Sequence, residues 1–400
     1  MAFLHGVEVI EVDTGIRPIQ VVRSSVIGIV GTAPDADAAA FPLNEPVLIA
    51  GNRTEAAKLD TLGNGNGTLP GALDAVFDQI GATVVVIRVD EGVDTAATVS
   101  NVIGGVDATT GEYQGVQALL AAESKVGVQP RILIAPGFTS HVTRNATTQV
   151  IEGAPVVAEL QGIADRLRAI VIADGPNTTD AEAIAYAGLF GHRRTYVVDP
   201  WVKFWDAAAS AEALEGASAR VAGIIAKSDN ERGFWWSPSN REMAGIIGTA
   251  RPVDFALGDP GARANLLNEN NVAAIIQKDG YRLWGNRTTS SDPKWQFLSV
   301  VRTADVINDS LLQAHLWAVD RGITRTYVTD VVNGVNEFLR QLVTQGAIIG
   351  GRAFADAEAN TPAAIASGQV SFDFEFTPTY PAERVTFRSR LTDEFLVEIV

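Results

Sequence analysis

The chain has 400 residues and no cysteine, so it can form neither a disulfide bond nor a reactive thiolate. Its histidines are few, and His5, His141, His192 and His315 do not stand at the spacing of a metal-binding pair. We therefore expect no metal ion and no other cofactor. The absence of cysteine also suits assembly in a reducing cytosol.

The sequence also lacks the features of exported, membrane-bound and nucleic-acid-binding proteins. Residues 1–14 contain no basic segment followed by an apolar core, so we expect no secretion signal. No apolar run approaches the length of a membrane span, and we expect no membrane insertion. With 47 acidic and 31 basic residues, the chain has a formal net charge of -16. A chain of this charge repels phosphate, so we expect no nucleic-acid partner.

Motifs of catalysis are missing as well. The run GNGNG at 63–67 lacks the third glycine of the dinucleotide fingerprint and the Lys-Ser/Thr of a P-loop, so it is typical of a flexible turn. No Gly-x-Ser-x-Gly nucleophile elbow occurs. Trp284, Trp295, Trp317 and the pair at 235–236 are not interleaved with basic residues, and we expect them to pack in the core. These observations do not predict an enzyme.

One pattern leaves an enzyme or ligand-binding protein open as an alternative. In open α/β sheets, ligands bind outside the carboxyl ends of the strands. Pro136, Gly137, Asp174, Gly175 and Asp199 follow apolar runs and would stand at such ends. They are also ordinary turn residues, which is the interpretation we favour. We therefore expect the two carboxylates to be dispensable for assembly.

Apolar periodicity indicates alternating strands and helices in the first half of the chain. Buried strands are expected at 26–30, 84–89, 131–136, 169–174 and 195–200. Helices are expected at 69–80, 156–168 and 179–190. This alternation predicts parallel strands joined by crossover helices.

The remainder, from about residue 237, has an α+β pattern. Helical spacing of apolar residues predicts helices at 305–320 and 330–345, the second ended by Gly346. Strict alternation follows at Val370, Phe372, Phe374 and Phe376, which indicates a half-buried strand, with two more strands at 385–391 and 395–400. Buried ion pairs are expected between Arg287 or Arg302 and the acids Asp305 or Asp309.

A succession of short segments resembles the contractile tail sheath proteins of bacteriophages and of R-type tailocins. The segments in the second half are WWSPSN (235–240), LNENNV (267–272), LWGNRT (283–288), VRTADVI (301–307) and WAVD (317–320). Those near the two ends are FLHGVEV (3–9), SSVIGIVGTAP (24–34) and PAERV (381–385). The likeness covers most of the chain and is weakest over 94–220.

The resemblance implies a multidomain fold of the α/β and α+β classes. It would comprise a βα-rich central domain and a C-terminal α+β assembly domain with exchanged terminal strands. The expected divisions are an N-terminal extended arm (1–22), an N-terminal α/β part of the sheath core (23–93), an outer α/β domain (94–220), a C-terminal α+β conserved sheath domain (221–384) and a C-terminal strand arm (385–400).

Both ends of the chain are expected to contain strands without a hairpin partner nearby. Such strands either pair within their own subunit or are donated to another chain, where backbone hydrogen bonds hold them. We favour exchange between subunits. The residues assigned to it are Val7, Glu8, Val9, Ile10, Val12, Phe395, Leu396, Val397, Glu398, Ile399 and Val400.

The resemblance also implies that the C-terminal region faces an inner tail tube. The candidate contact is the helix at 330–345 with the turn that follows it, although an ordinary surface helix would have the same pattern. Its assigned residues are Asn333, Glu337, Arg340, Gln341 and Arg352.

The function implied is structural. Copies of the chain would polymerise as stacked hexameric rings around the tube, and contraction would drive the tube through the bacterial cell envelope during phage genome ejection. The partners implied are further copies of the chain, the inner tail tube protein, and the baseplate and tail terminator proteins. The location implied is the virion tail, assembled in the host cytoplasm. A sheath of a tailocin or of another contractile injection system is the alternative within the same class.

Overall fold

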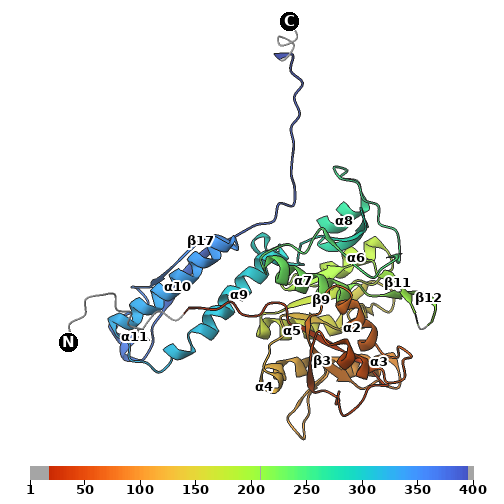
Figure 1. Ribbon diagram of the computed structural model, residues 1–400, viewed down its shortest axis with the longest axis horizontal. Helices are drawn as coiled ribbons and strands as arrows, with labels where there is room; N and C mark the ends of the chain where they lie inside the picture. Colours follow the sequence, from red (N-terminus) through yellow and green to blue (C-terminus); the bar gives the residue numbers. More distant parts are fainter. Residues whose placement is uncertain (1–17, 208, 395–400) are drawn as a thin grey trace, which may run out of the picture.

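The computed structural model describes residues 18–207 and 209–394. It has a large lobe and an elongated small lobe, and the last described residues run away from both (Figure 1). Among the described residues, no helix is both long and apolar enough to cross a membrane.

The large lobe is built on a nine-stranded sheet with the order β13-β16-β15-β10-β9-β6-β1-β3-β2. The strands are β1 (Ile27–Thr32), β2 (Pro46–Ala50), β3 (Thr83–Val89), β6 (Ile132–Ile134), β9 (Ile170–Asp174), β10 (Thr195–Val198), β13 (Arg241–Glu242), β15 (Val272–Gln277) and β16 (Tyr281–Trp284). Six neighbouring strands of the sheet are parallel, in the order β15, β10, β9, β6, β1 and β3. The outer strands β2, β16 and β13 are antiparallel to their neighbours. The parallel strands have continuous apolar runs because helices bury both faces of the sheet.

Two layers of helices form two cores on the sheet. One core contains α2 (Leu69–Phe77) and α7 (Ser218–Arg232), which pack against each other. The other contains α3 (Thr95–Ile103), α5 (Pro155–Leu167) and α6 (Asp180–Gly188). Successive residues of one strand enter different cores, as expected for a pleated strand. The predicted βα pattern is confirmed, with parallel strands joined through crossover helices.

The large lobe also contains shorter helices and strands outside the nine-stranded sheet. They are α1 (Arg53–Ala56), α4 (Ala122–Val126), α8 (Arg263–Glu269), the 3-10 helices at 57–59, 115–121 and 293–295, and the strands β4 (Gly105–Val106), β5 (Tyr113–Gln114), β7 (Thr143–Arg144), β8 (Ile151–Gly153), β11 (Val202–Asp206), β12 (Ala211–Glu215) and β14 (Gly248–Thr249). The glycine-rich run at 63–67 is the turn that the sequence predicts, because the Asp60 carboxylate accepts hydrogen bonds from the backbone of Gly63 and Gly65.

The small lobe has its own core. Its elements are α9 (Leu298–Ala314), a 3-10 helix (Leu316–Ala318), α10 (Arg325–Gln345), β17 (Ile348–Ala355), α11 (Pro362–Ala366) and β18 (Phe372–Pro378). The helix predicted at 330–345 starts earlier, because Thr324 caps the helix by accepting from the Tyr327 backbone N–H, and it ends at left-handed Gly346 as predicted. Ile19 and Val22 of the N-terminal segment are buried in this core.

Buried ion pairs join α9 to the large lobe. Arg302 pairs with Asp229 at 2.5 Å, and Asp305 accepts two hydrogen bonds from Arg194, at 2.6 and 3.0 Å. The expectation that Arg302 is buried in an ion pair is confirmed, but the expected partners are wrong. Asp305 lies one turn further along α9 and faces the start of β10, so it pairs with Arg194 instead.

A second buried acid on the same face of α9 completes this joint. Asp309 contacts both Arg131, just before β6, and Arg168, just after α5. Arg131 and Arg194 both precede parallel strands, so α9 crosses the amino ends of the sheet. Arg287, the other arginine expected to pair with these acids, contacts Glu383 instead.

The nine-stranded sheet crosses the expected divisions of the chain. It takes β1, β2 and β3 from residues 23–93, β6, β9 and β10 from 94–220, and β13, β15 and β16 from 221–384. The divisions at 93/94 and 220/221 therefore fall inside the part of the chain that builds one sheet.

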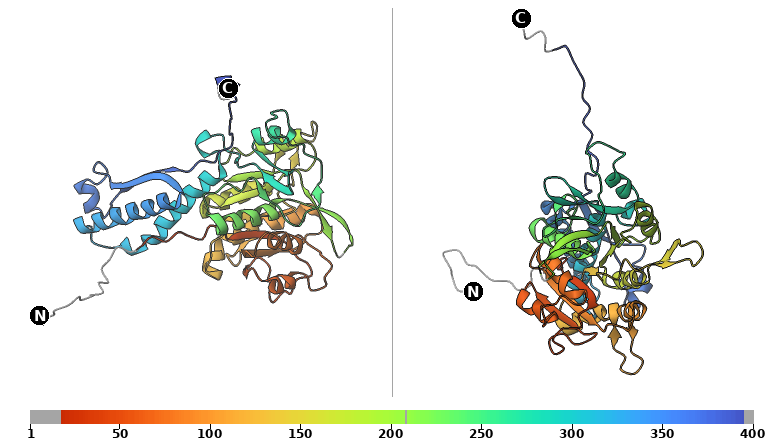
Figure 2. Two further views of the ribbon diagram at one scale, coloured as in Figure 1. Left: turned by 45° about the horizontal axis from the view of Figure 1, so that its top comes forward. Right: turned by 90° about the vertical axis from the view of Figure 1, so that its right-hand side faces the viewer.

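The strand predicted at 385–391 is not formed. These residues lie away from both lobes in every view, and the described part of the chain places no second strand beside them (Figure 2). Without a partner, the segment has no ladder of backbone hydrogen bonds to make it a strand.

We predict that Asp305→Ala destabilises the subunit by about 3–5 kcal/mol, because it leaves the Arg194 guanidinium buried without its main partner. Urea unfolding followed by tryptophan fluorescence measures the loss. Glu212→Ala, which breaks the exposed pair with Lys203, is the control and should change stability by about 1 kcal/mol at most. Equal effects of the two substitutions would contradict the interpretation of α9 as an electrostatic joint.

Candidate functional site

Asp174 stands at the carboxyl end of β9 and is fully buried. Its carboxylate accepts hydrogen bonds from the Ser218 backbone N–H at 2.7 Å and from the Ser218 hydroxyl at 2.5 Å. Gly216 lies so close that a Cβ there would stand 2.4 Å from the carboxylate. Burial raises the pKa of Asp174 to about 6, against the opposing effect of the Ser218 hydrogen bonds.

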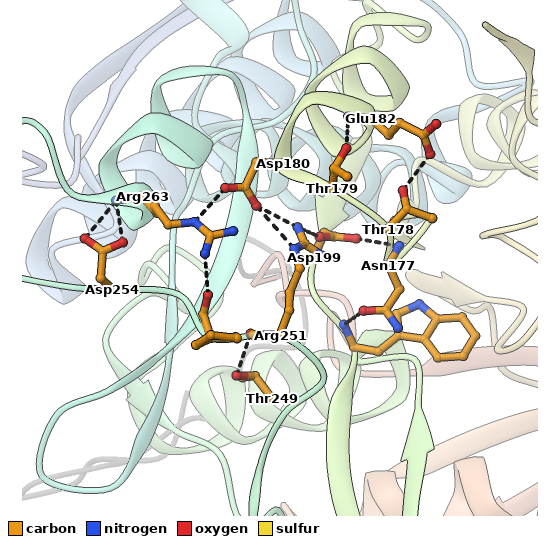
Figure 3. A network of polar contacts seen from close by, with 12 residues as sticks. Asn177, Thr178, Thr179, Asp180, Glu182, Asp199, Thr249, Arg251, Asp254 and Arg263 are labelled. Carbon is orange, nitrogen blue, oxygen red and sulfur yellow. Dashed lines mark hydrogen bonds and ion pairs between the residues drawn. The ribbon is translucent and has the colours of Figure 1, made fainter. Parts of the chain in front are cut away.

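Asp199, at the end of the neighbouring β10, belongs to a polar network that fixes loops around it (Figure 3). It accepts from the Asn177 backbone N–H at 2.9 Å and contacts Arg251. Arg251 also binds Asp180, in the first turn of α6, and Arg263 binds the same carboxylate at 2.8 Å. Burial raises the pKa of Asp199, whereas the hydrogen bond from Arg263 is the main cause that lowers the pKa of Asp180.

These contacts correct the interpretation of Asp174 and Asp199 as ordinary turn residues. Both carboxylates are buried and hold chain segments together, and Ser218, Gly216 and Arg251 occupy the space in front of them. No cluster of three or more potential metal-ligating side chains occurs in the described part of the chain. The carboxylates therefore serve the packing of the large lobe, and the geometry gives no support to a ligand crevice at these strand ends.

The β17–β18 hairpin offers a different kind of site, an open strand edge. The two strands pair from Ile348 with Pro378 to Ala355 with Phe372. The outer edge of β17 is closed at Ala353, because the Asn336 side chain of α10 donates to its carbonyl and accepts from its N–H, both at 2.9 Å. The described residues place no strand on the other side of β18. The outer edge of β17 has no neighbouring strand there either, but Asn336 occupies part of it, whereas no α10 side chain bonds to the edge of β18 in the described residues.

The two faces of β18 differ in chemistry. Phe372, Phe374 and Phe376 pack against the core of the small lobe. Asp373 and Glu375 alternate with them and are exposed. The free edge thus borders an apolar face on one side and an acidic face on the other. A strand that extends this sheet needs the same alternation, with basic residues opposite the acids.

The described C-terminal segment has that alternation. Val385, Phe387 and Leu391 are strongly exposed apolar residues at odd positions. Arg388 and Arg390 occupy even positions between them. The sequence predicted a strand at 385–391, but these five residues were not among those assigned to strand exchange. The residues that were assigned to it, at 7–12 and 395–400, lie outside the described part of the chain.

The structure brings together most of the residues assigned to the tube contact. Asn333, Glu337, Arg340 and Gln341 line the face of α10 that points away from its buried residues, and Arg340 binds Glu337 at 2.6 Å. Arg352 is not among them. Its neighbour Ala353 is buried toward the core, so Arg352 points to the opposite face of the hairpin, where it binds Glu375.

The tryptophans only partly follow the expectation of core packing. Trp235 and Trp317 pack against the core of the small lobe. Trp236 is exposed, with Arg232 over its ring at 5.2 Å from the centroid.

Comparisons with known proteins place the chain among sheath proteins over its whole length. Family profiles match at residues 24–89 (tail sheath protein Gp18 domain III N-terminal region), 111–289 (phage tail sheath protein central domain) and 290–392 (phage tail sheath C-terminal domain). The chain is 46% identical to a putative prophage major tail sheath protein of Pseudomonas aeruginosa strain UCBPP-PA14, covering 100% of this chain and 99% of that one. It is 38% identical to the tail sheath protein of Escherichia phage P2, covering 99% and 97%.

Solved structures share the fold. The contracted helical sheath of the anti-feeding prophage matches with a TM-score of 0.71 at 18% identity, over 98% of this chain and 100% of that one. The contracted PVC sheath of an extracellular contractile injection system matches with a TM-score of 0.67 at 17% identity, over 98% and 99%. The likeness extends through residues 94–220, where the short segments of the sequence resemble the family least.

We predict that Asp174 makes stability fall as the pH rises from about 4 to 7. The folded pKa of about 6 exceeds the unfolded value, so the stability contributed by the protonated group is fully present below about pH 4 and lost as the pH rises through 6. Relative to Asp174→Asn, the wild-type unfolding free energy should fall by about 3 kcal/mol over this range.

Urea unfolding at a series of pH values measures this difference. Asp60→Asn is a control in which the pH dependence runs the other way. The hydrogen bond from the Gly65 backbone N–H lowers the pKa of Asp60, so the stability that the ionised Asp60 contributes is lost as the pH falls. Parallel curves for wild type and Asp174→Asn would refute the prediction.

Proposed function

Since this chain belongs to the phage tail sheath family, and is thus a structural subunit of a contractile tail sheath, we propose that its copies stack as hexameric rings around an inner tail tube. Contraction of the stack drives the tube through the bacterial cell envelope. The ends of the stack meet baseplate and tail terminator proteins. The assembled sheath is part of the virion tail and forms in the host cytoplasm.

The observation that carries this proposal is the combination of a free strand edge and an unpaired arm in one chain. The edge of β18 lacks a neighbouring strand, and residues 385–391 lack a partner, within the part of the chain that the structure describes. The arm points away from its own hairpin (Figures 1 and 2). An arm that leads away from its own edge is free to pair with the edge of the next copy, which leaves a further edge free and so continues the polymer.

Charge and hydropathy support this pairing. When the arm lies beside β18, its apolar positions continue the phenylalanine face, and Arg388 and Arg390 stand on the side of Asp373 and Glu375. Each backbone hydrogen bond in such a junction contributes on the order of 1 kcal/mol. Several bonds per junction, repeated along the stack, hold the subunits together while allowing the lobes to move. Residues 7–12 and 395–400 extend the exchanged strands at the two ends of the chain.

We place the small lobe toward the tube and the large lobe outside. The exposed face of α10, with Asn333, Glu337, Arg340 and Gln341, is the proposed tube contact. Residues 94–220 contribute strands and helices to the large lobe alone, at a distance from this face (Figure 1).

We predict that deletion of residues 385–400 gives a folded subunit that forms no long tubes. The deleted segment makes no contact with either lobe in the described residues, so the fold should survive. Circular dichroism and electron microscopy measure fold and assembly. Normal tubes from the truncated chain would rule out strand exchange by this arm.

A charge reversal gives a sharper version of the same test. Arg388→Glu combined with Arg390→Glu should impair tube formation, and adding Asp373→Arg should restore part of it, since cross-strand charges would again be opposite. Failure of the third substitution to restore any assembly would place the arm elsewhere than beside β18.

We predict that Arg340→Glu weakens co-assembly of sheath and tube at low salt, with the effect shrinking as ionic strength rises, because exposed charges are screened. Lys278→Glu, an exposed charge reversal in the large lobe, is the control and should leave the tube contact intact. Cosedimentation with tube across a salt series measures both. Equal binding by wild type and Arg340→Glu at every salt concentration would exclude α10 as the contact.

A further inference from the structure

The root of the C-terminal arm is held by one bidentate ion pair. The Arg287 guanidinium donates to the two carboxylate oxygens of Glu383 at 2.7 and 2.6 Å. The two residues are 96 positions apart in sequence. Arg287 belongs to the loop after β16 in the large lobe, and its backbone forms an isolated bridge with Phe297, directly before α9. The pair therefore ties the start of the arm to the junction of the two lobes.

This pair is the last tie between the arm and its own subunit. Just before it, Thr379 donates from its backbone to the carbonyl of Ala347 at 3.3 Å, and the Tyr380 ring meets Phe297 edge to face. Beyond Glu383, the described residues 384–394 make no hydrogen bond or ion pair with either lobe. The direction in which the arm leaves the subunit is therefore set at Glu383.

We propose that the Arg287–Glu383 pair is the pivot that aims the C-terminal arm at the next subunit. The inference rests on the proposed strand exchange and assigns it a positioning pair outside the exchanged strands. A planar guanidinium that binds both oxygens of a carboxylate fixes the orientation of that carboxylate as well as its distance. A single-point contact would let the arm swing.

Subunits whose arm has a fixed direction assemble more readily than subunits whose arm moves freely. Restricting the directions that the arm samples raises its effective concentration at the neighbouring edge and lowers the ordering cost of pairing. The pair is partly exposed, with side-chain exposures of 29% for Arg287 and 40% for Glu383. Its contribution to the stability of the folded subunit is therefore small. Its loss should change where the arm points and leave the fold intact.

The absence of cysteine allows a direct measurement of this direction. Spin labels on Lys278→Cys in the large lobe and Ser389→Cys in the arm report their separation in dilute, unassembled subunits. Two substitutions disrupt the pivot without a large change of size: Arg287→Lys keeps the charge but loses the bidentate fork, and Glu383→Gln loses the charge. Glu55→Gln in α1, which removes the carboxylate of the exposed ion pair between Glu55 and Lys58, is the matched control.

We expect a narrow distance distribution in the otherwise wild-type chain and in the control, and a clearly broader one in both pivot variants. Without labels, the pivot variants should need about a fivefold higher protein concentration to form tubes. An unchanged distribution in the pivot variants, or a broad one in the wild type, overturns the pivot. A broadened distribution with unchanged assembly overturns its role in aiming. Failure of strand exchange itself would show separately, as normal tubes from the chain that lacks residues 385–400.

Discussion

The proposed assembly depends on a backbone edge that the described residues of its own chain leave unpaired. In β18, one side is bonded to β17 and the other side has no strand among the described residues. The outer edge of β17 also lacks a neighbouring strand there, but Asn336 of α10 occupies its hydrogen-bonding groups at Ala353. The edge of β18 is therefore the less obstructed of the two. Open edges recruit other chains, and folded proteins usually cover them. In the proposed assembly, the open edge and the unpaired arm supply the two halves of a repeating contact.

A directional contact of this kind needs a rigid support. The small lobe is attached to the large lobe through α9, whose buried acids and arginine pair with Asp229, Arg194, Arg131 and Arg168. Loss of one partner of a buried ion pair strongly destabilises a protein, because the other charge stays buried without compensation. These pairs therefore favour a single arrangement of the two lobes. A subunit held in this way can change its position among its neighbours as one rigid body.

The sequence was sufficient for the elements with strong periodicity. Runs such as 84–89 and 169–174 are apolar because helices cover both faces of the sheet, and such runs predict buried parallel strands directly. The sequence could not predict which arginine meets which acid, because residues 302, 305 and 309 share a helical face but point at different elements. It also could not reveal that residues 385–391 form no strand within the described part of the subunit. Alternation shows that a segment is able to pair, and only the fold shows whether a described strand lies beside it.

The central claim is that the arm of one copy lies beside β18 of another. Two single-cysteine chains of different size, Glu375→Cys in one and a substitution along the arm in the other, can be mixed, assembled and oxidised. A disulfide needs Cα atoms within about 7 Å. The account predicts mixed dimers with cysteine at Arg388 or Arg390, which share the face of Glu375, and few with cysteine at Phe387, which faces the other way. Cross-links that form equally at all three arm positions, or only within one chain, would contradict it.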